Sequence, residues 1–213
     1  MRLYYSFWQR GSQVVFSALY NVRVFGRENI PIDGGMLLLS NHQSFLDPML
    51  CGLSLPREMD YMARDSLFHN RWFGRYIRSV NAFPVHRGKA DTRAIKEIIR
   101  RLKAGRAVMM FPEATRTEDG RIRTIKSGFE LIARRSGATT VPVVIDGAFE
   151  VWPRHQILPG MGRINVQIGQ AITPEEAKEL GRDKFVAEVN RRLRTMQNEL
   201  RQRFGKEPFD YEG

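Results

Sequence analysis

Short apolar runs alternate with segments of helical periodicity along most of this chain, and this alternation restricts its fold more than any other feature. The runs have the length of strands and are rich in Met, Leu, Val and Ile; they cover residues 36–40, 59–63, 83–85, 107–111, 141–145 and 164–168. Strands that alternate with helices predict a single α/β domain with a mixed, mostly parallel sheet flanked by helices. Pro84 lacks a ladder donor, so we expect the run 83–85 to be an edge strand or a bend.

The helix signals are capping residues or proline at the start and glycine at the end. They predict helices over residues 48–55, 91–105, 126–135 and 173–204, the last with a break at Gly181. The chain contains no internal repeat, low-complexity tract or shift in composition that marks a second globular domain.

Residues 1–24 are predicted to form an amphipathic helix ahead of a domain over residues 25–213. Apolar or small residues recur there at helical spacing, at Leu3, Phe7, Gly11, Val14, Ala18 and Val22. Such a helix lies in a bilayer interface or packs on the core of its own domain, and the pattern fits both. No segment reaches the roughly 20 apolar residues that a transmembrane helix needs.

The chain is strongly basic, with 34 Lys and Arg against 23 Asp and Glu and a net charge of +11. Such a surface attracts an anionic membrane, nucleic acid or acidic molecules. A basic nucleic-acid-binding module is therefore an alternative, but helix-turn-helix, zinc-finger and RNA-recognition patterns are missing, so nucleic acid is not the expected partner. The single cysteine, Cys51, excludes an intrachain disulfide and fits a reducing compartment.

The strongest motif places a histidine and an acid where a strand ends and a helix begins. His42 follows the run 36–40, and Asp47 stands directly before Pro48. Ligands of α/β proteins bind at this edge of the sheet. An imidazole there can take the proton of an alcohol that attacks a carbonyl, while a carboxylate orients the ring. The alternative is that Asp47 only caps the helix and His42 is a core residue.

Two further polar motifs follow strands. In the segment 111–117, Arg116 can grip a phosphate through two hydrogen bonds, and Glu113 can orient that arginine or accept from a substrate hydroxyl. In the segment 81–87, Arg87 is a second candidate phosphate ligand. The alternative for both motifs is a solvated turn with surface arginines.

Together these motifs, N-H-x-x-x-x-D, F-P-E-x-T-R and the weaker block 81–87, resemble those of the glycerolipid acyltransferase family, in particular its lysophosphatidic acid acyltransferase branch. A proline-containing apolar strand at 141–145 matches a fourth block, and the resemblance extends from about residue 25 to 169. Two positions depart from the family pattern, since Asn81 and Ala114 replace glycines. If position 114 requires positive φ, alanine costs stability there or moves the loop.

The resemblance implies a role for each site residue. His42 and Asp47 become the catalytic pair, and the acceptor phosphate is bound by Arg87, Glu113, Thr115 and Arg116. Arg64 stands near the place of a family lysine that is proposed to assist the oxyanion. Backbone N–H groups near Pro48 are further expected oxyanion donors.

The expected reaction is transfer of a fatty acyl group from acyl-CoA or acyl-acyl carrier protein to a lysophospholipid hydroxyl, with 1-acyl-glycerol-3-phosphate as the leading acceptor and phosphatidic acid as product. Glycerol-3-phosphate and a lyso-aminolipid are alternative acceptors. Transfer is expected to be direct, because the chain lacks the G-x-S-x-G motif of a serine nucleophile. We expect no cofactor and no metal, an anionic membrane surface as partner, and a peripheral or monotopic place on the cytoplasmic face.

Overall fold

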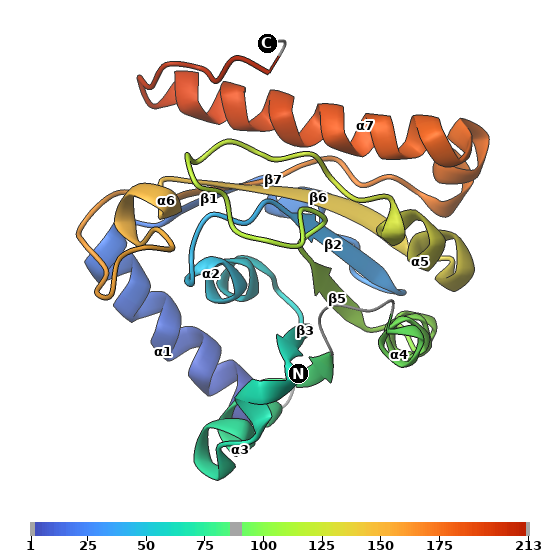
Figure 1. Cartoon of the computed structure of the whole chain (residues 1–213), viewed down its shortest axis with the longest axis horizontal. Coiled ribbons are helices and arrows are strands. Elements are labelled where there is room, and N and C mark those ends of the chain that lie inside the picture. Colours follow the sequence, from blue (N-terminus) through green and yellow to red (C-terminus); the bar gives the residue numbers. More distant parts are fainter. Residues whose placement is uncertain (1–2, 86–90, 212–213) are drawn as a thin grey trace.

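A seven-stranded sheet runs through the middle of the molecule, with helices on both of its faces (Figure 1). The computed structural model describes residues 3–85 and 91–211. The strands, in their order across the sheet, are β1 (Arg23–Phe25), β7 (Asn165–Ile168), β6 (Thr139–Asp146), β2 (Met36–Ser40), β5 (Ala107–Met110), β3 (Met59–Arg64) and β4 (Ala82–Val85). The pair β6–β7 is antiparallel, and the other five neighbouring pairs are parallel. The predicted mixed, mostly parallel sheet is therefore confirmed.

Both edges of the sheet are formed by short strands. β4 carries Pro84 and lies at one edge, as its missing donor predicts. β1 forms the other edge through parallel pairing with β7, and its three residues were too few to be recognised in the sequence. Short edge strands with proline limit pairing with other chains.

The helices form two layers. Their bounds are α1 (Leu3–Tyr20), α2 (Asp47–Ser54), α3 (Arg71–Ser79), α4 (Thr92–Lys103), α5 (Gly128–Ser136), α6 (Ala148–Val151) and α7 (Pro174–Arg203), with 3-10 turns η1 (Arg27–Asn29) and η2 (Asp65–Phe68). One core lies between the sheet and α1 and α2, and the other lies between the sheet and α4, α5 and α7. The predicted break in α7 is confirmed, since Gly181 has φ 71° inside that helix. Helices α3 and α6 were not predicted from the sequence.

Strand β2 shows why both faces are covered. Its five residues are all buried, and alternate side chains enter different cores: Leu38 packs with α1 and α2, while Leu37 and Leu39 pack on the opposite side. A strand that is apolar on both faces has to lie in the interior of a parallel sheet with helices on either side.

Helix α1 turns much of its apolar surface outward. Its inner side is held by Phe16 and Tyr20, which join the core, and by Gln9 and Gln13, which donate hydrogen bonds to carbonyl groups at the end of α2. The exposed large side chains of α1 are Phe7, Val14, Val15 and Leu19, each at least half accessible. Packing on the domain thus uses a side of the helix with both aromatic and glutamine side chains, and it leaves another apolar side uncovered.

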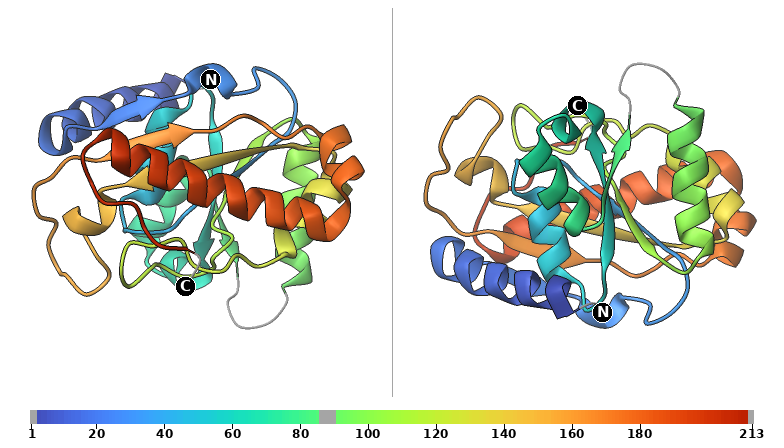
Figure 2. Two further views of the ribbon diagram at one scale, coloured as in Figure 1. Left: turned by 90° about the horizontal axis from the view of Figure 1, so that it is seen from above. Right: turned by 90° about the horizontal axis from the view of Figure 1, so that it is seen from below.

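The carboxyl ends of β2, β3, β5 and β6 meet at one edge of the sheet because these four strands run in the same direction. The loops that leave β2 and β5 lie side by side there, since the backbone N–H of Thr117 donates to the carbonyl of His42 at 2.8 Å. Figure 2 shows the whole fold from above and from below. Within the described residues, no helix has both the length and the apolar character needed to cross a membrane.

Candidate active site

His42 and Asp47 are in direct contact in the turn between β2 and α2. Nδ1 of His42 lies 2.7 Å from Oδ2 of Asp47, which confirms the predicted return of the carboxylate to the imidazole. The same oxygen accepts the backbone N–H groups of Gln43 and Ser44 at 2.6 and 2.8 Å. Since N–H groups only donate, this oxygen is an acceptor, so Nδ1 of the ring donates to it. In the neutral form of the ring the lone pair then lies on Nε2.

Asp47 is completely buried, and burial raises the pKa of its carboxyl group. Hydrogen bonds from His42 and from the backbone at positions 43 and 44 oppose this rise, because they favour the charged form. The carboxylate is therefore held rigidly in one orientation behind the imidazole. Such an arrangement fixes the tautomer of the ring and stabilises the imidazolium that forms when the ring accepts a proton.

The His42 ring is supported from one side by Phe111. The two rings stack with their centroids 3.8 Å apart and an interplanar angle of 11°. The imidazole side chain is 14% exposed, so part of it remains reachable from solvent. Stacking and the hydrogen bond to Asp47 together restrict the orientation of the ring.

Glu113 joins the two loops of the site through backbone hydrogen bonds. Its Oε1 accepts the N–H of His42 and its Oε2 accepts the N–H of Arg123, both at 2.7 Å. The side chain is 4% exposed, and burial raises its pKa to about 7 although both hydrogen bonds oppose the rise. Both oxygens already hold backbone groups, so in this structure Glu113 positions the loop that carries His42 and does not point toward a substrate.

Arg116 lies on the same turn as Glu113 and faces the α2 loop. Its guanidinium sits 3.5 Å from the ring centroid of Phe45, which is a close cation–π contact. Arg116 and Thr115 are both half-buried. The turn passes through Ala114 with φ 61°, and Asn81 also has positive φ, at 67°. The two departures from the family's glycines thus both fall on left-handed backbone.

Two predicted site residues remain: Arg87, a phosphate ligand, and Arg64, the expected oxyanion residue. Arg87 falls outside the described residues. Arg64 ends β3 at the same edge of the sheet as His42 and is exposed there. Two strand intervals separate β3 from β2, which corresponds to about 10 Å.

The expected oxyanion donors near Pro48 are already occupied. The N–H groups of Met49 and Leu50 both donate to the carbonyl of Leu46, at 3.0 and 2.9 Å, and Pro48 has no N–H. Within residues 3–85 and 91–211, no group of three or more His, Cys, Asp or Glu side chains is placed to hold a metal ion.

A supporting network behind the site was not predicted. Gln43 donates to the carbonyl of Gly120 at 2.8 Å, and Gln197 of α7 donates to the same carbonyl at 2.9 Å. Tyr211 accepts the N–H of Ile122 at 2.9 Å and donates to Gln197. The carboxyl-terminal segment thus clamps the loop after β5. Gln43 lay inside the recognised motif, but the sequence holds no signal for a partner 77 residues away.

Asn41 performs a similar task on the other side of His42. Its side chain donates to the carbonyl of Ile145 at 2.9 Å and accepts the N–H of the same residue at 2.8 Å. This pair of bonds continues the contact of β2 with β6 beyond the strand end. The backbone on both sides of His42 is therefore anchored.

Comparisons with known proteins agree with this geometry. The family model described as Acyltransferase matches residues 21–146. The 1-acyl-sn-glycerol-3-phosphate acyltransferase of Bacillus subtilis (strain 168) is 30% identical over 93% of this chain and 99% of that protein. The protein of the same name from Streptococcus pneumoniae is 29% identical over 91% of this chain and 72% of its own.

A solved structure shares the fold. The crystal structure of PlsC from Thermotoga maritima, titled as a 1-acyl-sn-glycerophosphate (LPA) acyltransferase, superimposes with a TM-score of 0.84 at 26% identity. The match covers 95% of this chain and 81% of that chain. It therefore includes both layers of helices as well as the sheet.

Proposed function

This chain belongs to the acyltransferase family, and we propose that it transfers a fatty acyl group from an acyl thioester to the free hydroxyl of 1-acyl-glycerol-3-phosphate, forming phosphatidic acid. The observation that carries this proposal is the 2.7 Å contact of His42 with a fully buried Asp47 at the carboxyl edge of the sheet. The names of the relatives from two bacterial species support the choice of acceptor.

In the proposed reaction, Nε2 of His42 takes the proton of the acceptor hydroxyl while the oxygen attacks the thioester carbonyl. The new C–O bond forms and the C–S bond breaks, so the acyl group passes directly to the acceptor. The leaving thiolate takes up the proton that His42 holds, which restores the neutral ring. Asp47 stabilises the intermediate imidazolium, and its rigid hydrogen bonds preserve the orientation of the ring.

The acceptor phosphate is proposed to bind at Arg116, with Thr115 on the same turn and Arg87 as further ligands. Arg64 is proposed to assist the oxyanion. A guanidinium offers two parallel N–H donors to a phosphate, and the Phe45 ring beneath Arg116 holds it at one place. Glu113 acts in this scheme by holding the backbone of His42. The donor is coenzyme A thioester or acyl carrier protein thioester.

The test is thiol release from both donors in the presence of lysophosphatidic acid, glycerol-3-phosphate or a lyso-aminolipid. We expect release that depends on lysophosphatidic acid, and a loss of at least about 1,000-fold in His42→Ala. His155→Ala is the matched control, because His155 is exposed and lies in another loop. Release without an acceptor preference, or full activity of His42→Ala, would refute the proposal.

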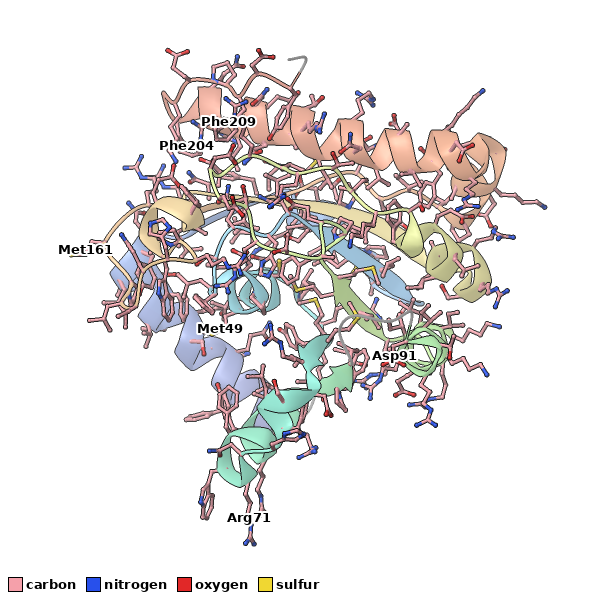
Figure 3. All side chains as sticks on the ribbon, viewed as in Figure 1. Met49, Arg71, Asp91, Met161, Phe204 and Phe209 are labelled. Atoms are coloured by element: carbon pink, nitrogen blue, oxygen red, sulfur yellow. The ribbon has the colours of Figure 1, made fainter. Side chains whose placement is uncertain are left out.

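We further propose that the enzyme works as a peripheral or monotopic protein on the cytoplasmic face of an anionic membrane. Support comes from the uncovered apolar side of α1 and from a nearby loop in which Ile157, Leu158 and Met161 are exposed. Met161 lies beside the upper end of α1 in Figure 3. The Arg-rich helix α7 lies across the sheet from α1 (Figure 1), so a flat bilayer that touches α1 does not reach it.

Deleting α1 is a poor test, since Phe16 and Tyr20 belong to the core. Phe7→Glu and Val14→Glu change exposed positions instead, and Ala104→Glu, at the residue after α4, is the control on the opposite face. We expect each α1 variant to bind anionic vesicles at least about 10-fold more weakly, because burying such a side chain contributes about 1.5–3 kcal/mol. Binding equal to that of the control would contradict a membrane role for α1.

A further inference from the structure

The segment 64–79, which contains η2 and α3, combines positive charge with exposed aromatic residues. It holds four arginines and one acidic residue, Asp65, whose carboxylate lies 3.2 Å from His69. Trp72 is 79% exposed, and Phe73 and Tyr76 are also open to solvent. Neither the reaction scheme nor the packing of the core explains why such large side chains lie on the surface.

The two kinds of side chain occupy different flanks of α3. Gly74 and Ile77 are buried and attach the helix to the domain. Arg71, Arg75 and Arg78 recur at spacings of four and three residues, so they share one flank.

Trp72 and Tyr76, four residues apart, share the other flank. A helix with aromatic residues beside a basic stripe is typical of segments that lie in the interface of an anionic bilayer.

The position of α3 is compatible with a flat partner that also touches α1. Seen from below, in the right panel of Figure 2, both helices face the viewer at separate places on the same side of the molecule. In Figure 3, Arg71 lies at the opposite end of the view from Phe204 and Phe209, which lie near α7. Helix α3 also follows the carboxyl end of β3, the edge of the sheet at which His42 lies.

We propose that α3 is a second membrane-binding surface, in which Arg71, Arg75 and Arg78 bind anionic lipid headgroups while Trp72 and Tyr76 enter the interface. Contact through both α1 and α3 holds the sheet edge with His42 against the bilayer, where a lysolipid acceptor resides. The exposed apolar residues lie on two separate helices. A planar bilayer can contact both helices at the same time, whereas a small acidic protein cannot. The inference rests on the proposed function for its purpose, but vesicle binding is measured without turnover.

The first test is charge reversal at Arg71, Arg75 and Arg78 to Glu, measured by sedimentation with phosphatidylglycerol-containing vesicles. Each basic residue near an anionic surface contributes about a five-fold factor, so we expect binding to weaken by about 100-fold or more. The matched control reverses Lys178, Arg182 and Lys184, which are exposed on α7. This control changes the net charge by the same amount. Its vesicle affinity should stay within about three-fold of wild type once added salt screens long-range electrostatic effects.

The second test measures the fluorescence of Trp72 in a chain that keeps the native α3. The chain has three tryptophans, so Trp8→Phe with Trp152→Phe leaves Trp72 as the single reporter. We expect its fluorescence to shift to shorter wavelength on anionic vesicles and to be quenched by lipids brominated near the headgroup. An unchanged spectrum on bound vesicles would overturn the proposal.

Turnover separates this inference from the proposed function. With a short-chain lysophosphatidic acid that stays monomeric, the α3 charge-reversal variant should release thiol at the wild-type rate, while its activity on vesicle-bound acceptor falls. If vesicle binding is unchanged but turnover with the carrier-protein donor falls, α3 is a protein-docking surface and the membrane proposal is wrong. Lack of turnover in wild type on every acceptor would refute the proposed function without affecting the vesicle result.

Discussion

The carboxylate of Glu113 holds the backbone N–H of His42 at 2.7 Å, across 71 residues of sequence. Its other oxygen holds the N–H of Arg123 at the same distance. One buried side chain thereby ties His42, the proposed general base, to the loop after β5. This contact affects both turnover and the pH dependence of stability.

Glu113→Gln should reduce turnover by about 10- to 100-fold at pH 8. The amide has one oxygen and one NH₂ group, so one of the two backbone N–H groups loses its acceptor and the loop shifts. Steady-state kinetics with lysophosphatidic acid measures the effect, and it should fall on kcat more than on KM. Glu118→Gln, an exposed neighbour, serves as control; equal effects in the two variants would exclude a positioning role for Glu113.

The same residue should make stability fall as pH rises from about 5 to 8. Its pKa is raised from 4.5 to about 7 in the folded state, so the folded protein binds more protons than the unfolded chain between these values. The contribution of Glu113 is therefore complete below pH 4.5 and is lost as pH rises through 7, by up to about 3 kcal/mol.

Urea unfolding of wild type and Glu113→Gln at pH 5 and pH 8 measures this contribution. The stability advantage of wild type over the variant should shrink at the higher pH, because glutamine does not titrate. An advantage that grows with pH would show that the carboxyl group has a lowered pKa instead.

Ala114→Gly should stabilise the protein by about 1 kcal/mol. Ala114 has φ 61°, a left-handed conformation that costs a residue with a Cβ roughly 1–2 kcal/mol, and the greater freedom of glycine in the unfolded chain offsets part of the gain. Ala104→Gly is the control, since Ala104 is exposed with φ −81°. Thermal and urea unfolding should show opposite signs for the two variants, and a destabilised Ala114→Gly would disprove the strain.

Tyr211→Phe should destabilise the protein by about 1–3 kcal/mol. It removes the acceptor of the Ile122 N–H and the donor to Gln197, which leaves buried polar groups without partners. Tyr76→Phe changes a residue of α3 that is 44% exposed and should stay within about 0.5 kcal/mol of wild type. Equal unfolding midpoints for the two variants would mean that the tail does not clamp the loop.

Local features of the site and fold were predictable. His42 and Asp47 are five residues apart, between the end of β2 and a helix start marked by Pro48, so their contact depends on one turn. The alternating strands and helices indicated a mostly parallel sheet, and Pro84 indicated an edge strand, because both signals act through the backbone of the segment that contains them.

Features that join distant segments were decided by the tertiary structure. The apolar stripe of α1 showed that the helix is amphipathic, but only packing against α2 and the sheet set which side faces outward. Strand β7 runs antiparallel to β6, and this direction depends on the path of the chain that connects the two strands. A carboxylate such as Glu113 accepts equally well from a substrate or from a backbone N–H, so its partner follows from the positions of both loops.

The sequence by itself thus determined the kind of chemistry, since a histidine, an aspartate and the arginine of the F-P-E-x-T-R motif lie at strand ends in the family's order. The tertiary structure decided which groups hold that chemistry in place and which surfaces of α1 and α3 remain uncovered. The physical reason is that residue type and spacing act within a few residues, whereas hydrogen-bond partners and exposure depend on segments that meet only in the folded chain.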